Sequence, residues 1–284
     1  SVSVDHATPA AFYAHQPNRS MYYEIALDLP KAGFDFYAGG GFLRHTSGES
    51  AETLIRETVL REPGPGYPCE LFDASKAFLA RYKALCTEKG SHLIIVLSPN
   101  LTAHALAEPG FLPYGESLMR YCRENDIPCF NFQYAKAEYL QNLDGYYYDL
   151  YHMNGTGADL FSAFFARFFN AYTSGEDVSG WFYADQAQYL ASIDRITNVW
   201  LSVGEGVYIA DCNRGTLVTP QYRFVSVAAD GTETTLLDDG ESDTISAALV
   251  PDGETLRVYA VPKGQENADS VWYDLSERSP RVES

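Results

Sequence analysis

The chain has 284 residues, of which 46% are hydrophobic and 14% aromatic, so it can bury a core and is not a disordered protein. Its formal net charge of −18 at pH 7 gives a surface that repels phosphate backbones, which argues against nucleic acid as a partner. No run reaches the ~18 apolar residues of a membrane-spanning helix, so no membrane span is expected.

The first 45 residues are predicted as strand, helix, helix and strand. Pro9 can open the first helix after Thr8, which is suited to the N-cap. The second strand of this segment covers residues 34–38 and ends at a run of glycines. Residues 46–70 are predicted as a connector, because they are first polar and then rich in proline and glycine.

The next stretch alternates helices with apolar strands, which is the pattern of a parallel sheet with helices on both faces. A run of helical period predicts a helix over residues 73–89, and its apolar side is formed by Phe78, Leu79, Tyr82 and Leu85. Residues 92–97 show no polar alternation and are predicted as a strand buried on both faces. A helix over 114–125 leads to a second buried strand over 127–132.

A short helix near residues 135–140 then precedes a loop and a helix over 157–171. The loop places Asp149 three residues before His152, in the run D-x-x-H-x-N-x-x-G-A. A carboxylate can fix the tautomer of an imidazole, and the imidazole can take a proton from a nucleophile. Such a pair just before a helix, at the carboxyl end of a sheet, lies where α/β folds build their sites. The alternative is structural: Asp149 caps the next helix and His152 only makes hydrogen bonds.

This run resembles the last sequence block of the SGNH/GDSL hydrolases and related O-acyltransferases, and the likeness covers about residues 70–175. The resemblance implies a flavodoxin-like, three-layer α/β domain over 46–180, in which His152 is the general base and Asp149 orients it. It also implies a small-molecule or glycan ester as substrate, no cofactor, and an extracytoplasmic or secreted location.

The serine that such a site requires has no evident sequence block in this chain. Ser50 is the nearest candidate nucleophile, but it lies in the polar connector with no buried strand directly before it. Ser98 and Asn100 follow the first buried strand, and we expect them to line the substrate site together with Asn154 and Tyr151. We therefore expect weak or absent esterase activity.

A second resemblance lies at the N-terminus. The run from Val4 to His15, with residues 34–41, looks like an internal stretch of alkaline phosphatases over about 43 residues. In that family the positions of His6 and Thr8 belong to a magnesium shell. One imidazole and one hydroxyl do not supply the near-octahedral oxygen ligands that Mg²⁺ requires, so no metal is expected. The two resemblances together imply a chimaera, with residues 1–45 packed on the sheet and their strands beside its apolar strands.

Beyond about residue 195 the sequence changes to short β-like runs, and no helix is expected there. Asp-Gly pairs at 230–231, 239–240 and 252–253 are turn signals between these runs. Their number and spacing predict a small sandwich over 195–284, of fibronectin-III-like or immunoglobulin-like type. Four aromatic residues are expected to attach the sandwich to the first domain: Trp181, Phe182, Tyr183 and Tyr189.

Two further functions stay open on the sequence. One is a phosphomonoesterase remnant that uses a metal at His6 and Thr8, and the other is a non-catalytic secreted module that binds glycan or protein. The five cysteines show no C-x-x-C spacing, which argues against a zinc or thioredoxin-like site. Cys122 and Cys129 flank a helix-to-strand turn and are expected to be free buried thiols.

Overall fold

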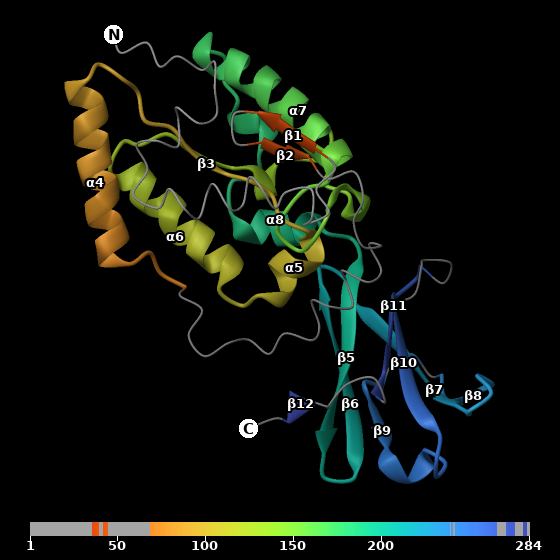
Figure 1. The fold of residues 1–284 in the computed structure, drawn as a ribbon. Coiled ribbons are helices and arrows are strands. Elements are labelled where there is room, and N and C mark those ends of the chain that lie inside the picture. Colours follow the sequence, from red (N-terminus) through yellow and green to blue (C-terminus); the bar gives the residue numbers. More distant parts are fainter. Residues whose placement is uncertain are drawn as a thin grey trace, which may run out of the picture.

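The fold combines helices around a small parallel sheet with a β-rich C-terminal part (Figure 1). The computed structural model describes residues 36–39, 42–44, 69–238, 240, 242–265, 271–275 and 281–282. The mixed α/β class and the change to strands after the helices are confirmed. None of the helices in these ranges is long and apolar enough to cross a membrane.

The parallel sheet pairs β3 (Ile95–Leu97) with β4 (Cys129–Asn131). The prediction of two parallel strands here is confirmed, although both are shorter than the apolar runs that predicted them. Val96 in β3 is 38% exposed, so the prediction of a strand buried on both faces was wrong. In the described part of the chain β3 pairs only with β4, and a strand at a sheet edge is less completely covered than a central one.

Two helices cover opposite faces of β4: α6 (Phe111–Glu124) and α7 (Gly155–Thr173). Side chains alternate along a strand, so neighbouring residues of β4 face different helices. The Phe130 ring lies edge-on to Phe168 of α7, with centroids 4.7 Å apart. Asn131 lies against Gly115 of α6, where an added Cβ would come within 3.3 Å of its amide nitrogen. Helices on both faces, as predicted, therefore hold for β4.

Short helices complete this part of the chain. They are α5 (Thr102–Ala107), α8 (Gln186–Ser192) and the 3-10 turns η1 (Phe132–Tyr134), η2 (Asp144–Tyr146) and η3 (Ser179–Trp181). The helix predicted near 135–140 is not formed; η1 and a turn take its place. The Asn131 side chain caps η1 by accepting the Gln133 N–H at 3.1 Å, which ends β4 in a tight turn.

Phe132 is the centre of an aromatic core between β4 and α7. Four rings surround it at centroid distances of 5.0–5.5 Å: Phe161, Phe164, Phe168 and Phe182. Trp181 stacks on Tyr139 beside this core, and Tyr189 stacks on Tyr134. Trp181 and Phe182 pack on this core, and Tyr183 and Tyr189 on a second cluster of the helical part. None of the four belongs to the core of the sandwich, so the expectation that they attach it was wrong. An ion pair of 2.9 Å, from Arg195 to Asp144, lies at the start of the sandwich instead.

Helix α4 (Asp73–Glu88) agrees with the predicted range to within one residue, but it buries none of its side chains. Its apolar side is exposed, with Phe78 at 65%. The Tyr121 hydroxyl donates to the Lys76 carbonyl oxygen at 2.8 Å and ties α4 to α6. The periodic apolar pattern therefore predicts the helix, but it does not predict whether the apolar side of the helix is buried.

Near the N-terminus the structure describes a hairpin of β1 (Phe36–Gly39) and β2 (Phe42–Arg44). The strand predicted at 34–38 exists, but it pairs antiparallel with β2 instead of lying beside β3. Two strands separated by so short a turn pair locally at little entropic cost. The other elements predicted before residue 69 lie outside the described residues.

The C-terminal part consists of two four-stranded sheets, in the orders β11-β10-β7-β8 and β12-β5-β6-β9. Their strands are β5 (Ile196–Gly204), β6 (Val207–Arg214), β7 (Pro220–Val227), β8 (Glu233–Leu237), β9 (Thr244–Ser246), β10 (Thr255–Pro262), β11 (Val271–Asp274) and β12 (Arg281–Val282). The 3-10 turn η4 (Ala247–Leu249) follows β9.

The two sheets pack together as a sandwich, as the sequence predicts in outline. Alternate side chains of β10 are buried, and Val258 from one sheet joins Leu201 of the other in the shared core. The glycines of the three predicted Asp-Gly turns all have positive φ, at Gly231, Gly240 and Gly253. Glycine is the residue that adopts this conformation without strain, so the turn predictions are confirmed.

Candidate active site

The side chains of Asp149 and His152 are in contact. Both carboxylate oxygens of Asp149 lie 2.9 Å from Nδ1 of His152. One of them, Oδ1, also accepts the backbone N–H groups of Tyr151 and His152 at 2.8 Å each. A carboxylate with these contacts favours a proton on Nδ1 in the neutral ring, and Nε2 then carries the lone pair.

The pair is open to solvent. The His152 side chain is 70% exposed and that of Asp149 39%. Over the described ranges, no group other than Asp149 hydrogen-bonds the His152 ring. An ion pair at such exposure contributes little to stability, about 0–1 kcal/mol. Its effect is to orient the ring, with Nε2 accessible to a substrate or to water.

The loop that carries the pair is closed on itself by backbone bonds. The carbonyl oxygen of His152 accepts the N–H of Tyr148 at 2.7 Å. Asn154 caps α7, with Oδ1 accepting the Gly157 N–H at 3.0 Å, and its Nδ2 donates to the Gly145 carbonyl oxygen at 2.8 Å. Both ends of the Asn154 amide thus join the helix to the loop, although the sequence placed this residue in the substrate lining.

Gly157 allows α7 to begin against the loop. A Cβ added there would lie 2.2 Å from the carbonyl oxygen of Tyr146, so no other residue fits without a shift. The same oxygen accepts the Asn154 N–H at 2.9 Å. The D-x-x-H-x-N-x-x-G pattern therefore has a structural basis in Asn154 and Gly157 as well as a chemical one in Asp149 and His152.

A chain of hydrogen bonds ties this loop to the ends of both parallel strands. Tyr147 donates to Asn142 Oδ1 at 2.6 Å, and Asn142 donates to the Asn100 carbonyl oxygen at 3.0 Å. The Asn100 N–H donates to Gln133 Oε1 at 2.7 Å, and Gln133 donates to the Tyr189 hydroxyl at 2.6 Å. Asn100 thus acts here through its backbone, not its side chain.

Gln133 and Asn142 are members of this hydrogen-bond network that were not predicted from the sequence. Gln133 is buried although it is polar, and it comes directly after β4. A polar residue at the carboxyl end of a parallel strand is a signal that could have found it. Asn142 lies in a loop and has no such signal.

Of the remaining predicted residues, only Tyr151 contacts the pair: its backbone N–H donates to Asp149, and its ring lies edge-on to the His152 ring with centroids 6.4 Å apart. Ser98 is exposed after β3 and makes no hydrogen bond to His152. Tyr151 is 45% exposed, and its ring lies edge-on to the buried His104 at 4.8 Å. Ser50, with the metal candidates His6 and Thr8, lies outside the described residues.

Two further features of the described residues concern metal ligands and cysteines. Within the residues that it describes, no three His, Cys, Asp or Glu side chains could hold a metal ion together. Cys122 and Cys129 are free thiols, the first buried and the second half-buried. Burial raises the pKa of both, which keeps them protonated and unreactive near neutral pH.

Alkaline pH is expected to unfold this part of the chain. Burial raises the pKa of the Tyr147 and Tyr134 phenols well above their usual range. In the unfolded chain tyrosine titrates near about 10, so the stability gained from these neutral phenols is complete below that pH and falls as the pH rises above it. Tyrosinate absorbance and circular dichroism, followed together, should show a fraction of the tyrosines ionising only as the fold is lost. Complete ionisation with the fold intact would contradict this.

Comparisons with known proteins show no family for this chain. No protein-family model, no curated protein and no solved structure matches it. Function has to be argued from the geometry of the Asp149–His152 pair and the residues that hold it.

Proposed function

We propose that the helical part of the chain is an SGNH/GDSL-like ester hydrolase, or a related O-acyltransferase, of flavodoxin-like, three-layer type. Its substrates would be acylated glycans or other esters, and its activity would be low. The observation that supports this is the pair itself, with both Asp149 oxygens 2.9 Å from His152 Nδ1. A general base needs this orientation, because Nε2 is then free to accept a proton.

In the reaction, Nε2 of His152 takes the proton of an attacking oxygen, and Asp149 stabilises the imidazolium that forms. The oxygen bonds to the carbonyl carbon of the ester. The C–O bond to the alcohol then breaks, and the alcohol leaves with the proton returned from Nε2. No hydroxyl within the described part of the chain bonds to His152, so we infer water as the nucleophile, and slow turnover follows.

The position of the pair also supports this function. Its loop is bonded through Asn142 to the segment after β3, and through Asn100 to Gln133 after β4. Parallel sheets build their sites at this carboxyl edge. We propose the sandwich as an accessory module of fibronectin-III-like or immunoglobulin-like type.

The test is hydrolysis of p-nitrophenyl acetate by the full chain and by His152→Ala. We expect slow turnover that the substitution abolishes. His92→Ala is the matched control, because His92 is another exposed histidine, at the opposite end of β3. Equal rates for the wild type and His152→Ala would refute the proposal. Ser50→Ala should leave the slow rate unchanged; fast turnover that requires Ser50 would instead identify a serine nucleophile.

A further inference from the structure

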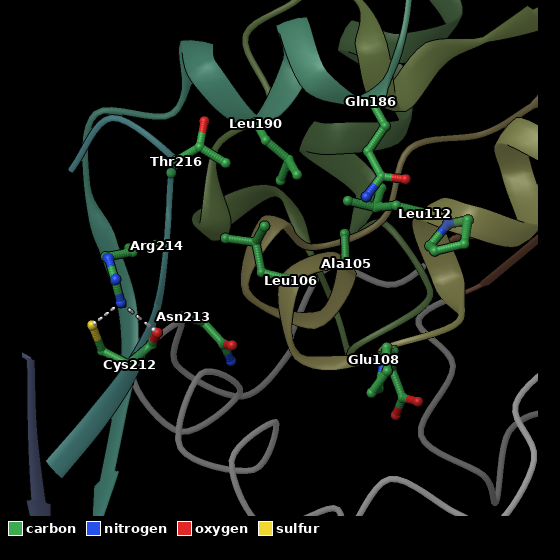
Figure 2. Close-up of a pocket in the computed structure, with 13 residues that line it drawn as sticks. Ala105, Leu106, Glu108, Leu112, Gln186, Leu190, Cys212, Asn213, Arg214 and Thr216 are labelled. Carbon is green, nitrogen blue, oxygen red and sulfur yellow. Dashed lines mark hydrogen bonds between the residues drawn. The ribbon is translucent and has the colours of Figure 1, made fainter. Parts of the chain in front are cut away.

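A cavity of about 430 Å³ lies between the helical part and the sandwich (Figure 2). One wall is formed by α5, α6, the turn between them and α8, and the other by the end of β6 with the two residues that follow it. Pockets that bind small molecules often lie at such junctions and have volumes of roughly 300–1,000 Å³. The lining shares no residue with the Asp149–His152 loop, so it is a separate site.

The lining contains one cationic and one anionic side chain, Arg214 and Glu108, and Figure 2 shows them on opposite sides of the cavity. Arg214 is held in place, since its Nε donates to the Val218 carbonyl oxygen at 3.0 Å and its Nη1 to the Cys212 sulfur at 3.4 Å. Among the described residues no acceptor bonds to its Nη2. A guanidinium fixed in this way is suited to bind a carboxylate.

Neutral polar groups also line the cavity. The side-chain amides of Asn213 and Gln186 and the hydroxyl of Thr216 line the cavity, and none of the three bonds to a described residue. Leu106 and Leu190 add an apolar surface beside them. This lining offers hydrogen bonds to amide groups and a contact for one apolar side chain.

We propose that this cavity binds a short free peptide of two or three residues. Its terminal carboxylate lies on Arg214, its terminal ammonium lies on Glu108, and its amide groups bond to Asn213 and Gln186. A zwitterion matches a lining in which one charge of each sign stands on a different side. The exposed Asp211 carboxylate lies 3.9 Å from Nη1 of Arg214, and the peptide carboxylate would compete with it for the guanidinium. This proposal is independent of the esterase function.

The test compares three forms of alanyl-leucyl-alanine by calorimetry on the full chain: with free ends, N-acetylated and C-amidated. We expect the free peptide to bind, and each modification to weaken binding by about fivefold, the upper range for a partly exposed ion pair. No binding of the free peptide, or equal affinity for all three forms, would overturn the proposal.

A substitution identifies which end lies at which wall. Glu108→Gln should weaken the free peptide about fivefold and leave the acetylated peptide unchanged, because that peptide already lacks the ammonium. Glu205→Gln, the same change at the exposed turn between β5 and β6, should leave all affinities unchanged. Arg214→Gln should likewise weaken the binding of the free peptide about fivefold and leave the affinity of the amidated peptide unchanged, because that peptide already lacks the carboxylate. Arg214 also donates to the Val218 carbonyl oxygen, so Arg214→Gln could fail to fold. In that case the Glu108→Gln result alone tests the proposal. An equal loss for free and acetylated peptides would refute the assignment.

Discussion

Asp149→Asn is expected to lower ester hydrolysis by about 30-fold and to leave the loop folded. The amide keeps one oxygen, which can still accept the backbone N–H groups of Tyr151 and His152 as Oδ1 does now. Its NH₂ group would then face Nδ1 of His152. That nitrogen has to accept, so the neutral ring carries its proton on Nε2 and cannot take one from an attacking oxygen. The expected loss is smaller than the ~10²–10⁴ typical of general bases, because His152 is exposed to water.

Nitrogen-15 NMR of the imidazole separates this cause from a damaged fold. The wild type should show a protonated Nδ1 and Asp149→Asn a protonated Nε2, each in the neutral ring. Asp252→Asn, in an exposed turn of the sandwich, makes the same chemical change far from the pair and should alter neither the tautomer nor the rate. An unchanged tautomer in Asp149→Asn would contradict the orienting role that we assign to the carboxylate.

The pair could be predicted from the sequence because it is local. Asp149 and His152 stand three residues apart, and the bonds that join the pair and cap the following helix are made within the segment from Gly145 to Gly157. Spacing alone then fixes which groups meet. The helix after the pair, the strands before it and the turns of the sandwich are likewise set by short-range patterns. Their presence is confirmed, although both strands are shorter than predicted.

What the sequence could not predict depends on contacts between distant segments. Gln133 meets Asn100 across 33 residues and Tyr189 across 56, and no local pattern marks these partners. The exposure of the apolar side of α4 and the packing of Trp181 within the helical part also depend on tertiary contacts, so the sequence did not predict them. Periodicity shows that a face is apolar, but only the tertiary fold decides what lies against it.

Gly157→Ala is expected to lower the free energy of unfolding by about 2–3 kcal/mol, within the range for overpacking. The new Cβ would lie 2.2 Å from the Tyr146 carbonyl oxygen and 2.8 Å from the Tyr146 Cβ. The loop cannot easily withdraw, because Asn154 bonds to that same oxygen and also to the N–H of Gly157. In an unhindered helix alanine would be more stable than glycine by about 1 kcal/mol, so the sign of the effect itself tests the close contact.

Gly145→Ala is the matched control, since it lies in the same loop and an added Cβ meets nothing within 4 Å. Thermal or denaturant unfolding should place this variant close to the wild type and Gly157→Ala well below it. The shift forced on Tyr146 would also move the chain that leads to Asp149 and His152, so we expect ester hydrolysis to fall in Gly157→Ala below its unfolding temperature. Wild-type stability in that variant would show that the helix does not press against the loop, and the geometry of the pair would then need another support.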